Sequence, residues 1–303
     1  MIARLAALLG LVWLSSAAAQ TCGTAAPVQV QVLGSGGPEL HDRRAASSYL
    51  VWIEGKARVL VDIGGGAALR FAESGATVSD LDVILLTRLR AGHTADLPAL
   101  LEASLSGKRA RPLPILGPGG NRFMPSTVTF VRALFDGTRG AYRHLGDLLN
   151  PLTRNGYKLQ PRDVRPSPDK LKPGPKPVGE TAYPFTNERL RAGAVPVIQG
   201  NIPTLVWRVE AGGKSLVFGG DAEARGEPLA RLARGADLLV THHTTPEGAG
   251  AIGHLAQQAQ AKQLLLSQRT RNTLGKEETI LAAVRQRYAG PAPFANDLDC
   301  LTP

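Results

Sequence analysis

The stretch LLTRLRAGHTADLP, residues 85–98, passes from a strand into a helix and gives the first indication of the fold. It continues an apolar run, residues 83–86, that is typical of a buried strand. Leucines then recur near the spacing of one helix face, at Leu97, Leu100, Leu101 and Leu105. A strand, a short loop and a helix N-terminus together form a common place for a functional site. His93 lies in this loop, after Arg88 and Arg90.

Strand-like and helical segments alternate along the rest of the chain. The predicted strands are residues 28–33, 49–53, 59–62, 83–86, 204–209, 215–218, 237–241 and 263–267. This alternation predicts an α/β fold. The chain has 303 residues, enough for one large α/β domain, and its 43% hydrophobic content supports a sizeable core.

The composition restricts the partners of the protein. Aromatic residues make up only 5% of the chain, which argues against a stacking platform for bases, so we expect no specific nucleic-acid partner. The formal net charge is +10. Such a basic protein attracts a small anion or an anionic surface, although solubility alone also accounts for the charge.

The N-terminus has the features of a secretory signal peptide. Arg4 supplies the positive charge, a Leu-rich run follows, and the alanines at 17–19 form a cleavage site. We therefore expect residues 1–19 to be removed, which leaves a single domain, residues 20–303, in the periplasm or outside the cell. No transmembrane segment would then remain. An uncleaved membrane anchor is the alternative interpretation.

Export gives a meaning to the only two cysteines of the chain. Cys22 and Cys300 lie near opposite ends of the mature protein. An oxidising compartment favours a disulfide between them, and two free surface thiols are the alternative.

One internal segment differs in composition from the rest of the chain. Residues 161–178, PRDVRPSPDKLKPGPKPV, hold six prolines and five basic residues and almost no side chains to bury. We expect this Pro/Lys-rich segment to be an extended surface arm, which serves as a solvated connector more readily than as a contact for an acidic partner.

Six short motifs follow one another along nearly the whole mature chain. They are VLGSGGP (32–38), VDIGGG (61–66), TRLRAGHTADLP (87–98), VPVIQGNIPTLVWRVE (195–210), SLVFGGD (215–221) and LLLSQR (264–269). In this order and spacing they resemble the motifs of metallo-β-lactamase-fold hydrolases, especially the ribonuclease Z and arylsulfatase-like branch. The resemblance implies a four-layer αβ/βα sandwich with a site for two zinc ions at one edge of its sheets.

The departures from this family pattern fall on the metal ligands. The resemblance implies seven ligand positions, of which only His93 and Asp221 keep a ligating side chain. The other five positions hold Arg88, Arg90, Gly92, Gln199 and Gln268. Guanidinium groups repel a divalent cation, and an amide oxygen suits harder ions than zinc. We therefore expect no bound cofactor where relatives hold zinc, and low metal occupancy at the two residual positions.

The two arginines indicate what replaces the charge of the metal ions. Arg88 and Arg90 together with Asp221 leave a net positive charge, as the two-zinc centre of the relatives would. Alternate residues of an extended segment point the same way, so we expect both guanidinium groups to reach Asp221 and also to approach Asp62. Arginines that turned to solvent after metal loss are the alternative. The candidate residues of the resulting anion-binding pocket are Arg88, Arg90, Asp62, Gln199 and Gln268.

The sequence therefore predicts an exported pseudoenzyme, a non-catalytic protein with a basic, anion-binding pocket. The alternative function is a metal-dependent hydrolase of phosphoester, sulfate ester or lactone substrates that uses a rebuilt site. Either His242 or His243 could complete such a site beside His93 and Asp221. Only one of the two neighbours would face inward, because consecutive residues of an extended segment point opposite ways.

Overall fold

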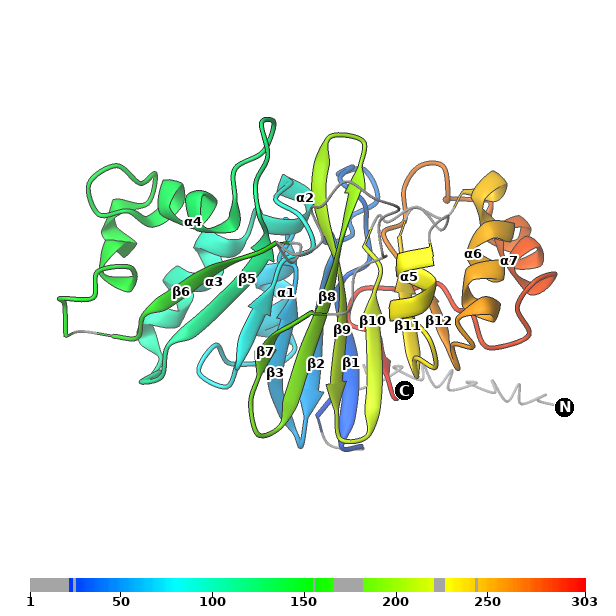
Figure 1. The fold of residues 1–303 in the computed structure, drawn as a ribbon, viewed down its shortest axis with the longest axis horizontal. Helices are drawn as coiled ribbons and strands as arrows, with labels where there is room; N and C mark the ends of the chain where they lie inside the picture. The colour runs from blue at the N-terminus through cyan, green and yellow to red at the C-terminus, as the bar shows by residue number, and fades with distance from the viewer. Residues whose placement is uncertain (1–21, 24–25, 155, 166–181, 221–226, 243–244) are drawn as a thin grey trace, which may run out of the picture.

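Two β-sheets packed face to face form the centre of the protein, and helices cover the outer face of each sheet (Figure 1). The structure is a computed structural model that describes residues 22–23, 26–154, 156–165, 182–220, 227–242 and 245–303. The order of layers is helices, sheet, sheet, helices. The predicted α/β class and the four-layer αβ/βα sandwich are therefore confirmed.

The first sheet has seven strands in the order β13-β1-β2-β3-β4-β5-β6. Its strands are β1 (Val28–Gly34), β2 (Ser48–Ile53), β3 (Lys56–Val61), β4 (Val83–Leu85), β5 (Leu113–Pro118), β6 (Leu159–Val164) and β13 (Cys300–Leu301). The strands from β13 to β3 pair antiparallel, and β3, β4, β5 and β6 pair parallel. Parallel pairing places the carboxyl ends of β3 and β4 at the same edge of the sheet.

The second sheet has six strands in the order β12-β11-β10-β9-β8-β7. Its strands are β7 (Ala182–Thr186), β8 (Leu190–Gln199), β9 (Ile202–Ala211), β10 (Lys214–Phe218), β11 (Leu238–Thr241) and β12 (Leu264–Leu266). The hairpins from β7 to β10 are antiparallel, whereas β10, β11 and β12 pair parallel.

Helices cover the two outer faces of the sandwich. The α-helices are α1 (Ala67–Glu73), α2 (Ala91–Thr94), α3 (Leu97–Ala103), α4 (Thr127–Phe135), α5 (Glu227–Leu232), α6 (Pro246–Gln258) and α7 (Glu277–Arg285). Two 3-10 helices, η1 (Ser104–Ser106) and η2 (Arg143–Leu148), complete the set for the described residues. Leu105 was expected on the buried face of the helix that follows His93, but its side chain is 52% exposed. The reason is that α3 ends at Ala103 and the tighter turn of η1 rotates Leu105 away from that face.

Three apolar layers hold the sandwich together. The middle layer joins the inner faces of the two sheets and includes Tyr49, Trp207 and Phe218. One outer layer packs α1, α3 and α4 on the first sheet, and the other packs α5, α6 and α7 on the second sheet. The strands are therefore buried on both faces, which explains their continuous apolar sequences.

The two ends of the domain lie side by side. Cys22 and Cys300 lie beside each other, with a Cα–Cα distance of 5.6 Å, and β13 pairs with β1. The predicted signal peptide, residues 1–19, lies outside the described residues. Within the described part of the chain, no helix has the length and apolar character needed to cross a membrane.

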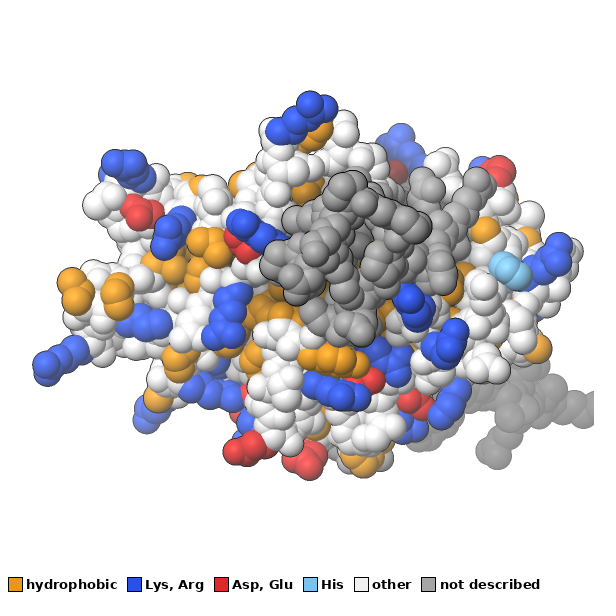
Figure 2. All heavy atoms as spheres, viewed as in Figure 1, with side chains coloured by type: hydrophobic (Ala, Val, Ile, Leu, Met, Phe, Trp, Pro, Cys, Tyr) orange, Lys and Arg blue, Asp and Glu red, His pale blue; other side chains and the backbone are white. Residues whose placement is uncertain are grey.

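The Pro/Lys-rich segment starts later than expected. Its residues 161–164 belong to β6, which pairs parallel with β5 at the edge of the first sheet. An edge strand tolerates Pro161, because a proline lacks only the amide hydrogen that an inner strand would need. Residues 166–178 lie outside the described residues. Figure 2 shows lysine and arginine side chains spread over the face that is viewed, with fewer acidic side chains between them.

Candidate functional site

Polar side chains from both sheets meet at the edge where their parallel strands end. Asp62 follows β3 and Thr87 follows β4 in the first sheet, while His242 follows β11 and Gln268 follows β12 in the second sheet. The carboxyl ends of parallel strands are where α/β proteins place their chemistry. The residues of this edge form two hydrogen-bonded groups, each centred on a histidine.

Asp62 organises the first group. Its side chain is completely buried. One carboxylate oxygen accepts a hydrogen bond from the amide of Thr87 (2.7 Å), and the other accepts one from the Thr87 hydroxyl (2.7 Å). The second oxygen also lies 2.8 Å from His93 Nδ1. The φ angle of Asp62 is 58°, a left-handed conformation that aspartate adopts more readily than most residues.

His93 is held at both ring nitrogens and is only 2% exposed. Because the Asp62 carboxylate accepts a hydrogen bond at Nδ1, that nitrogen carries the hydrogen and Nε2 is the acceptor. The side-chain amide of Gln268 lies 3.2 Å from His93 Nε2 and is the donor to it. The main chain also fixes this loop, because the amide of Ile63 donates to the carbonyl of His93 at 2.8 Å. His93 is therefore the residue that joins the two sheets within this group.

Tyr49 organises the second group. Its hydroxyl donates to Ser267 Oγ at 2.6 Å and lies 2.8 Å from His242 Nε2. The ring of His242 faces the ring of His93 with 6.0 Å between their centroids. Ser267 and Gln268 are consecutive, so the turn after β12 contacts both groups. The φ angle of 51° at Gln268 gives this turn a fixed shape.

The two arginines do not share the position that the sequence predicted. Arg88 is 1% exposed, whereas Arg90 is exposed at the N-cap of α2. The chain bends at Thr87 and at Arg90 and does not alternate as a regular strand would, and Asp221, the partner predicted for both arginines, lies outside the described residues. Asp62 receives its hydrogen bonds from Thr87 and His93, so neither arginine is its partner.

The other predicted positions lie apart from this network or cannot be placed. Gln199 ends β8, where it pairs with Ile202 in the hairpin, and is half-buried. Its side-chain oxygen is buried and has no hydrogen-bond partner in the part of the chain that the structure describes. Asp221 and His243 lie outside the described residues. Tyr49 is a site residue that the sequence did not indicate, because a tyrosine in a strand buried on both faces looks like any other core residue.

The described residues do not fit the two-zinc site that the resemblance implied. A catalytic zinc needs about three protein ligands that offer free lone pairs. No group of at least three His, Cys, Asp or Glu side chains lies together within the described ranges. The remaining imidazole of the signature, His93, has one nitrogen on Asp62 and the other on Gln268. The donor set is therefore different from that of a metal centre.

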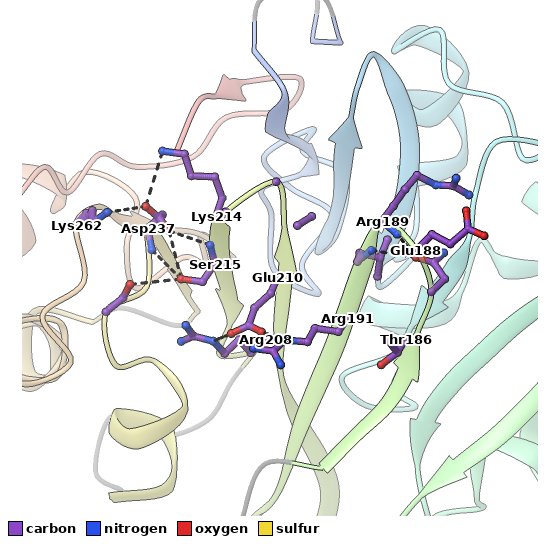
Figure 3. A pocket seen from close by; sticks show the side chains of 16 residues that line it. Thr186, Glu188, Arg189, Arg191, Arg208, Glu210, Lys214, Ser215, Asp237 and Lys262 are labelled. Carbon is purple, nitrogen blue, oxygen red and sulfur yellow. Dashed lines mark hydrogen bonds and ion pairs between the residues drawn. The ribbon is translucent and has the colours of Figure 1, made fainter.

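A separate hollow of about 610 Å³ lies at the opposite ends of the strands, between the β7–β8 and β9–β10 turns (Figure 3). Its basic side chains are paired with carboxylates: Arg208 and Arg191 with Glu210, and Lys262 with Asp237. Burial alone would raise the pKa of Asp237, but hydrogen bonds from Lys262 and the Ser215 amide lower it below its usual range. Because these charges neutralise one another, this hollow is a weaker candidate than the edge that holds His93.

Comparison with known proteins gives the family of the chain. No family model matches the sequence. The ribonuclease Z of Mycobacterium sp. (strain KMS) is 31% identical over 249 residues, which cover 80% of this chain and 74% of the relative. Among solved structures, the metallo-β-lactamase fold protein YhfI from Bacillus subtilis superposes with a TM-score of 0.65 at 17% identity, covering 90% of this chain and 98% of YhfI. The short form of human tRNase Z superposes with a TM-score of 0.63 at 19% identity and the same two coverages.

Proposed function

Since the chain belongs to the ribonuclease Z family of metallo-β-lactamase-fold hydrolases, we propose that it hydrolyses phosphoester bonds at the carboxyl ends of β3, β4, β11 and β12. The observation that carries the proposal is the buried group formed by Asp62, Thr87 and His93. A carboxylate that orients a histidine is the arrangement that general acid–base catalysis requires.

The expectation of a non-catalytic protein is corrected by the relatives of the chain. That expectation came from counting the zinc ligands that the chain lacks. The count bears only on activation of water by zinc, which is one of several ways to activate water. The ribonuclease Z relatives are hydrolases by name, and their similarity extends over most of both chains. A metal-dependent hydrolase with a rebuilt site, which the sequence offered only as the alternative, is the interpretation that these relatives support better.

The mechanism starts from the orientation of His93. Asp62 holds the hydrogen on Nδ1, so Nε2 is the nitrogen that takes a proton from water. As this proton moves, the water oxygen bonds to phosphorus and the ester bond from phosphorus to the leaving oxygen breaks. The leaving oxygen keeps the electron pair of that bond and takes a proton back from the imidazolium.

No step of this mechanism passes through a metal ion, because the described donor set does not fit the two-zinc centre. A phosphoester is favoured over a sulfate ester or a lactone because the relatives named ribonuclease Z act on a phosphodiester polymer.

The test is an assay of the purified protein with bis(p-nitrophenyl) phosphate, p-nitrophenyl sulfate and a simple lactone. We expect hydrolysis of the phosphodiester, with kcat lowered about 10²- to 10⁴-fold in His93→Ala, the usual contribution of a general base. His254→Ala is the matched control, because this histidine is exposed on α6, and it should keep wild-type kcat. Hydrolysis of none of the substrates, or full activity of His93→Ala, would contradict the proposal.

We also propose that the protein is exported and that its two cysteines are joined there. The composition of residues 1–19 supports export, and a Cα–Cα distance of 5.6 Å suits a disulfide between Cys22 and Cys300. Intact mass spectrometry of the expressed protein without reductant should find a chain that begins at Gln20 and lacks two thiol hydrogens. A full-length chain with two alkylatable thiols would disprove both statements.

A further inference from the structure

The position of Gln268 has a consequence for how the water would be activated. We propose that Gln268 takes the place of a metal ion at His93: it is a positioning residue that holds Nε2 and then orients the attacking water, so that hydrolysis does not use zinc bound to His93. This inference rests on the proposed function, whose reaction it describes in more detail.

While the hydrogen bond between the two side chains is intact, it occupies the nitrogen that a metal would need. The amide nitrogen of Gln268 lies 3.2 Å from His93 Nε2, close enough to donate to its lone pair. A zinc ion on that nitrogen would stand about 2.0–2.1 Å away and would need the same lone pair. Asp62 occupies the other nitrogen at 2.8 Å, so neither side of the ring is available while this network is intact.

Gln268 is held in place by its surroundings and is not a flexible surface residue. It is 2% exposed, and its φ angle of 51° belongs to the turn that ends β12. The preceding residue, Ser267, is fixed by the hydroxyl of Tyr49 at 2.6 Å. The amide therefore approaches His93 from a rigid element of the second sheet.

The second atom of the same amide indicates where a water would bind. The side-chain oxygen of Gln268 is buried and has no hydrogen-bond partner among the described residues, and such an atom is costly to leave unsatisfied. A water has two hydrogens, so it can donate one to His93 Nε2 and the other to this oxygen once the amide turns. The Gln268 oxygen and His93 Nε2 then each accept a hydrogen bond from this water. One of its hydrogens points at Nε2, the nitrogen that takes the proton.

The first experiment measures metal and histidine state, independently of activity. Wild-type protein is incubated with excess zinc chloride, desalted, and analysed for zinc by mass spectrometry. We expect the retained zinc to be far below one ion per chain, and the ¹⁵N resonances of His93 to report hydrogen on Nδ1 with or without added zinc. One zinc per chain, accompanied by a change in the Nε2 resonance of His93, would overturn the inference.

The second experiment tests Gln268 directly. Gln268→Met keeps the length of the side chain but removes its donor and acceptor, so kcat should fall about 10- to 100-fold, at or below the lower part of the range for acid–base catalysis, with little change in KM. The Nε2 resonance of His93 should move as well. Gln263→Met is the matched control, since Gln263 precedes the same short strand at its other end, and both quantities should keep wild-type values.

The outcomes separate this inference from the proposed function. Hydrolysis that requires zinc on His93 would leave the function in place and overturn the role of Gln268. Unchanged kcat and an unchanged His93 resonance in Gln268→Met would do the same. Zinc-free protein with the expected His93 resonances but no hydrolysis would instead remove the proposed function, and with it the role of Gln268 in orienting water.

Discussion

Replacing Asp62 should show how much of the site depends on one buried carboxylate. The carboxylate accepts two hydrogen bonds from Thr87 and one from His93, at 2.7 to 2.8 Å. Asp62→Ala removes all three and leaves the donors buried. Loss of one partner of a buried charged group costs about 3–5 kcal/mol. A left-handed backbone costs an alanine roughly 1–2 kcal/mol more, so the free energy of unfolding should fall by about 4–7 kcal/mol.

Asp62→Asn should have a smaller effect on stability and a large effect on chemistry. Asparagine tolerates the φ angle of 58° and can still accept from the Thr87 amide. Hydrogen bonds to a charged group contribute about 1.5–3 kcal/mol and neutral ones about 0.5–1.5 kcal/mol, so the three bonds together should lose about 3–4.5 kcal/mol. The new NH₂ group faces His93 Nδ1, which must release its hydrogen. The hydrogen then moves to Nε2, the nitrogen that was to receive a proton.

The assay is urea unfolding followed by tryptophan fluorescence, with kcat and the ¹⁵N spectrum of His93 measured on the same samples. Asp82→Asn is the matched control, because Asp82 is also buried but lies at the start of β4, at the opposite edge, where it binds Arg111 and Arg189. It should lower stability and leave kcat unchanged. The reasoning fails if Asp62→Ala unfolds with the wild-type midpoint, or if Asp62→Asn keeps hydrogen on Nδ1 of His93.

Two further outcomes concern charged groups. Burial alone would raise the pKa of Asp82, but hydrogen bonds from Arg111 and Arg189 lower it below its usual range. Ionised Asp82 therefore stabilises the folded state fully above the ordinary pKa of aspartate. This stabilisation is lost as the pH falls through the lower pKa that Asp82 has in the folded protein. The urea midpoint of the wild-type protein should therefore fall more steeply below about pH 4 than that of Asp82→Asn, and parallel curves would contradict this. Arg88→Ala should cost about 2 kcal/mol or more because this side chain is 1% exposed, whereas exposed Arg90→Ala should stay within about 0.5 kcal/mol, and equal midpoints would contradict the placement of the two arginines.

The sequence predicted the fold well because its signals extend over many residues. The run before Thr87 is β4, and the predicted strands at 28–33, 49–53, 204–209 and 215–218 correspond to β1, β2, β9 and β10. Strand β5 was not predicted, since prolines at 114 and 118 interrupt its short apolar run. The start of β6 was assigned to the Pro/Lys-rich segment for a related reason, because Pro161 lies within it.

The site was predicted less well because it depends on a few side-chain directions. The histidine at 93 and the aspartate at 62 were placed correctly at neighbouring strand ends. The period of a regular strand predicts the same environment for Arg88 and Arg90, but the chain bends at Thr87 and at Arg90, and Arg90 is exposed while Arg88 is buried. Gln268 was read as a lost zinc ligand, because nothing in a sequence shows that an amide donates to a histidine across two sheets.

The difference between the fold and the site also explains why a count of ligand positions is not enough to describe this edge of the sheets. Asp62 and His93 have a structural role of their own: their contacts, with the bond from the Ile63 amide to the His93 carbonyl, fix the loop between β4 and α3. Gln268 stands where the family pattern places a histidine ligand, and its amide contacts His93 from the turn after β12, a strand that the core holds. Replacing Asp62 or His93 should therefore disturb this loop as well as the site, whereas replacing Gln268 should change mainly the contact with His93.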